Sequence, residues 1–195
     1  LTIQGVPEHA GTAPMQTRRD AATAGAELIL YIEERAKQDT DSVGTVGILQ
    51  VPRGSLNVVP GRCQFSIDLR APNDPQRDAL DQDVRAKLDE IAERRGITYQ
   101  LEEILRIPAA PSASALQSLW EESVMDLGLP LCRMNSGATH DAMIMHRLLP
   151  QAMLFVRNEY RGISHNPLES LTNDDAQTAV ETFAELLIHL EKRFS

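Results

Sequence analysis

Residues 62–70 read RCQFSIDLR, and this stretch alternates apolar and polar side chains at every position. In an extended chain successive side chains point to opposite faces, so the stretch predicts a β-strand with one buried face. The apolar face consists of Cys63, Phe65, Ile67 and Leu69. The polar face consists of Arg62, Gln64, Ser66, Asp68 and Arg70.

The segments around this strand alternate between strand and helix patterns. Apolar residues recur at helical spacing over 18–37, at Ala24, Leu28, Ile32 and Ala36, and again at Leu80, Val84, Leu88 and Ile91, with Gly96 placed to end that helix. Strands are expected at 1–6, 43–51 and 97–105. Residues 1 to about 106 therefore predict the order β-α-β-β-α-β, the ferredoxin-like arrangement of an antiparallel sheet covered on one side by two helices.

The second part of the chain has a different pattern of residues. A Pro/Ala/Ser stretch at 106–114 is a natural boundary, and a helix is expected at 115–127. The apolar run 151–156, QAMLFV, predicts a strand covered on both faces. A last helix is expected after a cap at Thr172 or Asn173, with its apolar face formed by Ala176, Val180, Phe183, Leu187, Leu190 and Phe194. This part predicts a helix-strand-helix piece of a covered α/β sheet.

Composition excludes several classes of partner. The 195 residues carry a net charge of −9, which argues against nucleic-acid binding, and no apolar run approaches a membrane span. No signal peptide is recognisable, and two cysteines without metal or disulfide spacing favour a cytoplasmic protein. The chain begins LTIQGV without Met, and we expect it to be a piece of a longer protein.

Three histidines lie on loops rich in Gly, Ser, Thr and Pro: His9, His140 and His165. His146 and His189 fall within helical patterns and suit surface or core-edge positions better. His165, in GISHNPLES, could be a metal ligand or a turn histidine bonded to its own loop. A catalytic zinc needs about three protein ligands, and no HExxH or paired-Cys motif is present, so further ligands would have to come from outside this chain.

Asn57 and Arg70 flank the strand described first. An arginine fork suits bidentate carboxylate binding and an asparagine adds directed hydrogen bonds, although a strand-end arginine could equally pair with Asp68 or Asp74. Ser136, His140 and Asp141 do not form a GxSxG elbow, and their closeness in sequence argues against a serine-hydrolase triad.

Four segments in chain order carry a resemblance to a known family: HAGTAPMQTRRDA (9–21), LNVVPGRCQFSIDLR (56–70), SGATHDAM (136–143) and GISHNPLES (162–170). Together they resemble the allantoate amidohydrolase and N-carbamoyl-L-amino-acid hydrolase family, within the superfamily of two-zinc aminoacylases and carboxypeptidases. The resemblance implies a ferredoxin-like dimerisation (lid) domain at 1–107. It also implies, at 108–195, the C-terminal portion of a metallo-exopeptidase-like α/β catalytic domain.

The resemblance also assigns roles to residues. It implies that His165 is a ligand of a site for two divalent ions, Zn or Mn, that is incomplete in this chain. His9 becomes a catalytic residue that supports the oxyanion, from the same or the partner subunit of a homodimer. The resemblance further implies that the substrate is bound by Asn57, Arg70 and the loop containing His140. The family motif SGAGHDA has a glycine where this chain has Thr139, which would alter the pocket if that position needs a positive φ.

The expected activity is metal-dependent hydrolysis of a carbamoyl or amide C–N bond in a small carboxylate substrate, either allantoate or an N-carbamoyl-L-amino acid, with the isolated chain inactive. The alternatives are an aminoacylase or dipeptidase of the same superfamily, or a non-catalytic dimerisation module.

Overall fold

The computed structural model describes residues 1–194. The chain divides into two compact units, which are described separately below. The first contains Leu1–Ala109 together with Asn135–Gly137, and the second contains the remainder.

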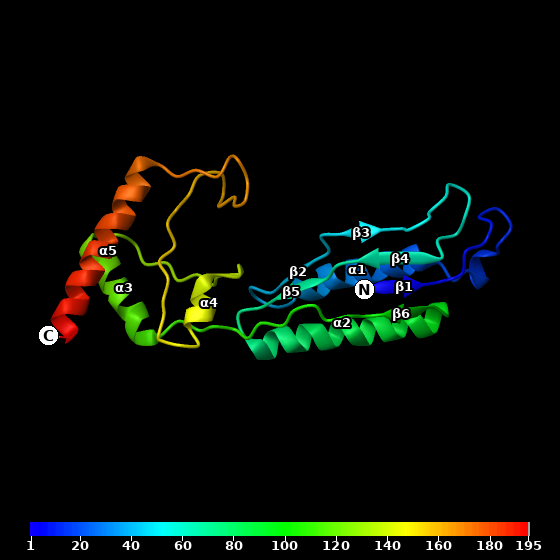
Figure 1. Cartoon of the computed structure of the whole chain (residues 1–195), viewed down its shortest axis with the longest axis horizontal. Helices are drawn as coiled ribbons and strands as arrows, with labels where there is room; N and C mark the ends of the chain where they lie inside the picture. The colour runs from blue at the N-terminus through cyan, green and yellow to red at the C-terminus, as the bar shows by residue number, and fades with distance from the viewer. Residues whose placement is uncertain (195) are drawn as a thin grey trace. The chain divides into compact units, whose positions relative to one another are not determined.

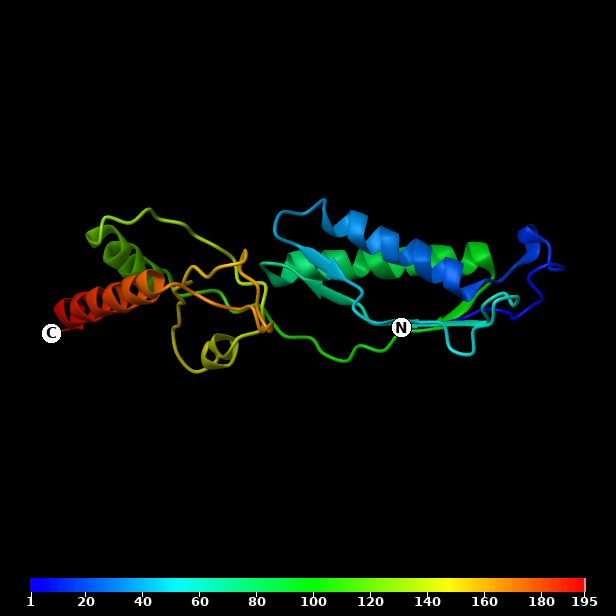
Figure 2. The same ribbon diagram turned by 90° about the horizontal axis from the view of Figure 1, so that it is seen from above.

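The first unit is an antiparallel sheet with two long helices. Its elements are β1 (Thr2–Gln4), the short 3-10 helix η1 (Met15–Thr17), α1 (Ala21–Ala36), β2 (Val43–Thr45), β3 (Leu49–Gln50), β4 (Arg62–Phe65), β5 (Asp68–Arg70), α2 (Asp74–Arg95) and β6 (Thr98–Gln100). Four strands form one sheet in the order β3-β4-β1-β6, and β2 pairs with β5 (Figure 1). Both helices cover the same face of the sheet (Figure 2). This is the predicted ferredoxin-like arrangement.

The apolar alternation of the strands supplies the core beneath the helices. Ile3 on β1 pairs with Cys63 on β4, and these two side chains are 0% and 1% exposed. All four residues expected on the inner face of α1, and all four expected on α2, are buried. The contact between sheet and helices therefore follows the two sequence periods, 2 for strands and 3.6 for helices.

Polar side chains fix the ends of both helices. Asp20 accepts hydrogen bonds from the Ala22 and Thr23 amides at the start of α1, and Asn73 accepts one from Gln76 at the start of α2. Gly96 ends α2 with a left-handed φ of 59°, as its position in the sequence indicates.

The strand that was expected over 62–70 is interrupted at Ser66. The Ile48 amide donates to the Ser66 hydroxyl (3.0 Å), and the Ser66 amide donates to the Ile48 carbonyl (3.1 Å). A side-chain oxygen thus replaces a main-chain carbonyl in the ladder, and the hairpin divides into β3-β4 and β2-β5. The alternation persists across the break, because Ile67 and Leu69 still pack against the core.

The strand expected at 97–105 is shorter than its sequence pattern. It ends at Gln100, and Ile104 and Leu105 are 90% and 73% exposed. The register pairs Gln100 with Thr2, and no described strand lies beside residues 101–105.

The second unit contains three helices, α3 (Ser114–Asp126), α4 (Asp141–Met145) and α5 (Asn173–Phe194). Leu119 on α3 and Leu186 on α5 are buried, and the Trp120 and Phe183 rings lie 6.0 Å apart. The Thr172 hydroxyl accepts from the Asp175 amide and caps α5. Among the described residues, no helix has the length and apolar character needed to cross a membrane.

Two predictions for this unit are wrong. Residues 151–156 do not form a strand, because no described segment of the unit lies alongside as a strand to pair with them. On α5 the most buried positions are Thr182 and Leu186, whereas Val180, Phe183 and Leu187 are more than half exposed. α3 covers a strip offset from the expected apolar face. The side chain of Phe194, also expected there, lies outside the described residues.

The buried face of α1 yields a stability prediction. Leu28 is 0% exposed, so Leu28→Ala should lower the free energy of unfolding by about 2–5 kcal/mol through lost apolar contact and a residual cavity. The same change at the fully exposed Leu56 should cost less than about 0.5 kcal/mol. Urea denaturation of both variants measures the difference, and equal losses would contradict this description of the core.

Candidate functional site

The loop that follows β1 places His9 beside Asn57. The Val59 amide donates to the Glu8 carbonyl and the Ala10 amide donates to the Asn57 carbonyl, both at 2.8 Å. His9 and Val58 form an isolated antiparallel bridge. Two segments about fifty residues apart in sequence are thereby joined at one end of the first unit.

The His9 ring is exposed, and its orientation is set by its own loop. Its Nδ1 atom accepts a hydrogen bond from the Gly11 amide at 3.1 Å. The Arg18 guanidinium donates to the carbonyls of Ala10 (2.6 Å) and Ala13, which holds the loop closed. Sequence reasoning missed Gly11 and Arg18, although both lie within the quoted motif HAGTAPMQTRRDA.

Asn57 lies exposed in the loop between β3 and β4, where its Oδ1 accepts from the Ser55 hydroxyl at 3.1 Å. The hydrogen bond from Ser55 therefore orients the whole side-chain amide of Asn57, including its nitrogen. The main chain of Asn57 is held by Ala10, so Asn57 and His9 form one local arrangement.

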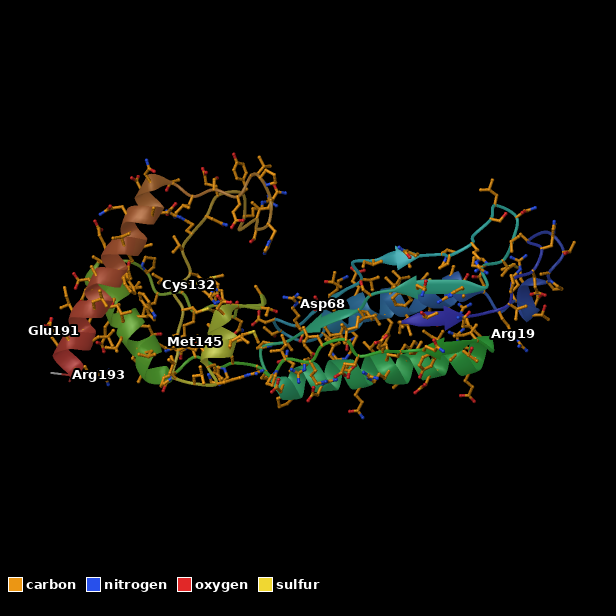
Figure 3. All side chains as sticks on the ribbon, viewed as in Figure 1. Arg19, Asp68, Cys132, Met145, Glu191 and Arg193 are labelled. Atoms are coloured by element: carbon orange, nitrogen blue, oxygen red, sulfur yellow. The ribbon has the colours of Figure 1, made fainter. Side chains whose placement is uncertain are left out.

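Arg70 lies at the opposite end of the first unit, which Figure 3 shows by the labelled Asp68 on β5 and Arg19 at the far end of the sheet. Residues 62–70 extend over roughly 25 Å at about 3.3 Å per residue. Asn57 and Arg70 therefore do not meet within one chain, and the expected joint clamp on a carboxylate does not form in this chain alone.

The Arg70 fork already engages a carboxylate. Its Nε and Nη2 donate to the two oxygens of Asp68 at 2.9 and 2.7 Å, and Nη1 donates to the Gly137 carbonyl at 2.7 Å. The two hydrogen bonds from Arg70 to Asp68 lower the pKa of the Asp68 carboxyl below its ordinary value. Of the two acidic partners considered from sequence, Asp68 is the one observed, and Gly137, the second residue of the SGATHDA motif, supplies the carbonyl that Arg70 binds.

His140 caps the short helix α4. Its Nδ1 accepts from the Ala142 amide at 3.1 Å, as His9 does from Gly11. The residue also lines an open, mainly apolar pocket of about 430 Å³ with Trp120, Met145 and Phe183. Among the described residues, Thr139 is not one of those with a positive φ. Threonine in place of the family's glycine therefore causes no left-handed backbone strain.

His165 differs from the other two loop histidines. Its φ is 54°, an uncommon left-handed value for a non-glycine residue, and its amide donates to the Glu169 carboxylate at 3.1 Å. The loop is closed by the Glu159 amide, which donates to the Ser170 carbonyl at 2.9 Å. Within residues 1–194 the His165 ring itself makes no hydrogen bond or ion pair, so both ring nitrogens remain accessible.

A separate group of metal-type side chains lies between α3 and α5. Ligand-type atoms of Asp126, Glu185 and His189 lie within 4.8 Å of one another. His189 Nε2 already lies 2.9 Å from Asp126, which gives the group an ordinary role as an interhelix polar contact. His165 does not belong to it.

The antiparallel sheet with its two covering helices and the histidine-bearing motif loops are those of a peptidase-type hydrolase. The chain matches the model of the peptidase family M20/M25/M40 over residues 5–189 and belongs to this family. The resemblance stated from the four sequence segments is confirmed at this level.

Individual relatives agree with the family. The chain is 35% identical to an N-carbamoyl-L-amino acid amidohydrolase from Geobacillus stearothermophilus, covering 97% of this chain and 45% of the relative. It is 32% identical to an allantoate amidohydrolase from Bacillus subtilis, covering 97% and 46%. An amidohydrolase/peptidase crystal structure from Burkholderia cenocepacia superimposes with a TM-score of 0.89 at 34% identity, over 96% of this chain and 46% of that one. The chain thus spans just under half the length of these relatives.

The contact between Arg70 and Asp68 yields a titration prediction. Arg70→Gln should raise the pKa of Asp68 toward the ordinary value of an aspartate, because the ionised carboxylate loses its charge-assisted hydrogen bonds. Since the folded-state pKa is lowered, the stabilisation is present above the unfolded-state value and is lost as pH falls through the folded-state value. Carboxyl ¹³C NMR titration measures the shift. Asp175, held by Thr172 and Arg157, serves as the unchanged control.

Proposed function

We propose that the intact protein hydrolyses a carbamoyl or amide C–N bond in a small carboxylate substrate, either an N-carbamoyl-L-amino acid or allantoate. The observation that carries the proposal is the ring of His165, which is exposed and makes no hydrogen bond or ion pair with any described residue, on a loop whose main chain is fixed. In a chain of this family, with relatives named for those two reactions, such a ring suits a metal ligand.

His165 fits a divalent metal ion chemically. A neutral imidazole is a good ligand for zinc and manganese, and Glu169 holds the main chain that presents it. One ligand does not make a site, so we propose that the other ligands of a two-ion Zn or Mn site come from residues outside this chain, which is inactive by itself. When bound, the metal supplies an activated water and polarises the scissile carbonyl.

The remaining residues act on the substrate. His9 donates a hydrogen bond to the oxygen that becomes negative as the carbonyl is attacked. Arg70 and Asn57 bind the substrate carboxylate, Arg70 through its fork and Asn57 through its amide. Because the fork now engages Asp68, the substrate carboxylate must share or displace that contact. The loop containing His140 lines the substrate pocket.

We further propose that the protein is a homodimer in which residues 1–107 form the dimerisation (lid) domain and 108–195 belong to the catalytic domain. Leu49 on the edge strand β3 and Ile48 directly before it are exposed, and Leu30 on α1 is 66% exposed, which provides apolar surface for a second copy. His9 and Asn57 then act in the partner's site, since they lie far from Arg70, which contacts the SGATHDA loop of its own chain.

The intracellular location is part of the same proposal. Cys63 is a buried thiol and Cys132 an exposed one, and both are free, which suits a reducing cytoplasm. The overall test is turnover by the intact protein of allantoate, N-carbamoyl-L-amino acids, N-acyl amino acids and dipeptides. Preference for the last two classes would replace this proposal with an aminoacylase or dipeptidase, and no turnover of any would favour a non-catalytic module.

The metal-ligand role of His165 predicts a specific loss. His165→Ala in the intact protein should lower bound metal and abolish turnover without changing the circular dichroism spectrum, because the exposed ring makes no hydrogen bond or ion pair with the described residues. Metal is counted by plasma mass spectrometry. His146→Ala, the same change at the end of α4, is the control and should keep full metal content. Unchanged stoichiometry in the His165 variant would remove that residue from the site.

The dimer arrangement predicts complementation between inactive variants. His9→Ala and Arg70→Ala homodimers should each be impaired. After random subunit exchange, about a quarter of wild-type activity should return, since half the dimers are mixed and each holds one intact site.

The matched control for this experiment mixes His9→Ala with Asn57→Ala. These residues lie together at one end of the same unit, so every site in a mixed dimer lacks one of them and activity should stay low. Recovery in this second mixture, or none in the first, would argue against the proposed sharing of sites.

A further inference from the structure

Several hydrogen bonds hold the exposed loop around His9. The His9 carbonyl accepts hydrogen bonds from the Thr12 and Ala13 amides at 3.2 and 3.1 Å. Arg18 binds the carbonyls of Ala10 and Ala13 from the other side. The main chain next to the ring is therefore held in one conformation, and the Gly11 amide points at Nδ1 of His9.

That single contact determines where the ring carries its proton. A ring nitrogen that accepts an N–H cannot itself hold hydrogen, so a neutral imidazole bonded in this way is protonated at Nε2. Nε2 is the outer nitrogen of the ring. The exposed edge of His9 then offers a hydrogen-bond donor and no basic lone pair.

Gly11 also determines how closely its amide can approach the ring. A Cβ at Gly11 would lie 3.3 Å from Cε1 and 3.5 Å from Nδ1 of His9. Contacts at 3.3 Å are tighter than ordinary van der Waals distance, so a Cβ would require the ring to shift by a few tenths of an ångström, which disturbs the 3.1 Å bond to the amide. Glycine at this position leaves room for the bond that selects the tautomer.

We propose that Gly11 is a positioning residue that holds His9 as the Nε2–H tautomer, so that the ring acts as a neutral hydrogen-bond donor to the substrate and not as a base. The catalytic part of this inference rests on the proposed function, in which His9 faces the reacting carbonyl. The tautomer itself depends only on the loop. His140 has the same contact, from the Ala142 amide, and provides a second example in the chain.

The direct test is ¹⁵N NMR of the intact protein labelled at histidine, in alkaline buffer where imidazole side chains are neutral. His9, assigned by the loss of its signals in His9→Ala, should show a pyrrole-type Nε2 and a pyridine-type Nδ1. An Nδ1–H ring, or an equal mixture of tautomers, would overturn the proposal whatever the activity of the protein.

Gly11→Ala tests the positioning role. The variant should lose the single tautomer and lose at least about tenfold in kcat, with a smaller change in KM and unchanged metal content, because a transition-state hydrogen bond is affected. Gly47→Ala is the matched control, since a Cβ there meets only the Ser66 hydroxyl at 3.9 Å. Retention of both the tautomer and kcat in Gly11→Ala would overturn the role of Gly11.

Two further variants separate this inference from the proposed function. A glutamine amide nitrogen can reach the place of Nε2, whereas that of asparagine reaches only Nδ1. His9→Gln should therefore keep more activity than His9→Asn or His9→Ala, while a base at this position could not be replaced by either amide. Full activity in all three, with the expected tautomer in the wild type, would overturn the catalytic role of His9 and leave the tautomer assignment in place.

Discussion

The burial of one apolar face of the four-stranded sheet under α1 and α2 is the contact on which the rest of the first unit depends. Ile3 opposes Cys63 in the register, and both side chains are almost fully buried. A shift of one residue would turn every apolar side chain of β4 toward solvent. Because the register is so strongly determined, the points at which loops leave the strands are determined as well: His9 bridges Val58 after β1, and Arg70 ends β5.

Main-chain amides, more than neighbouring side chains, orient the candidate catalytic rings. His9 and His140 each accept an amide two residues ahead, which assigns their outer nitrogen a proton. His165 shows the opposite arrangement, because its own amide is bound by Glu169 while the ring makes no bond among the described residues. His9 and His140 therefore differ from His165 in the ring atoms that they expose, and the proposed roles in substrate contact and in metal binding rest on this difference.

The periodic spacing of apolar residues predicted those helices and strands that pack against elements of the same unit. The inner faces of α1 and α2, the caps Gly96 and Thr172, and the alternation of residues 62–70 follow from local pattern. Residues 101–105 of the strand expected at 97–105, and the whole strand expected at 151–156, are not strands among the described residues, since an apolar or alternating run becomes a strand only beside another strand. The face of α5 was misplaced because α3 covers a strip that the amphipathic pattern of α5 alone does not specify.

The amino-acid sequence by itself determined the ferredoxin-like order, the motif loops and the family, because these depend on residue spacing and residue type. Only the tertiary structure decided which of these residues meet. It joined His9 to Asn57 through main-chain hydrogen bonds, separated both from Arg70, and gave that arginine Asp68 as its partner. The physical reason is that hydrogen bonds between distant segments depend on strand register and on the interruption at Ser66, and neither is encoded in the spacing of any single motif.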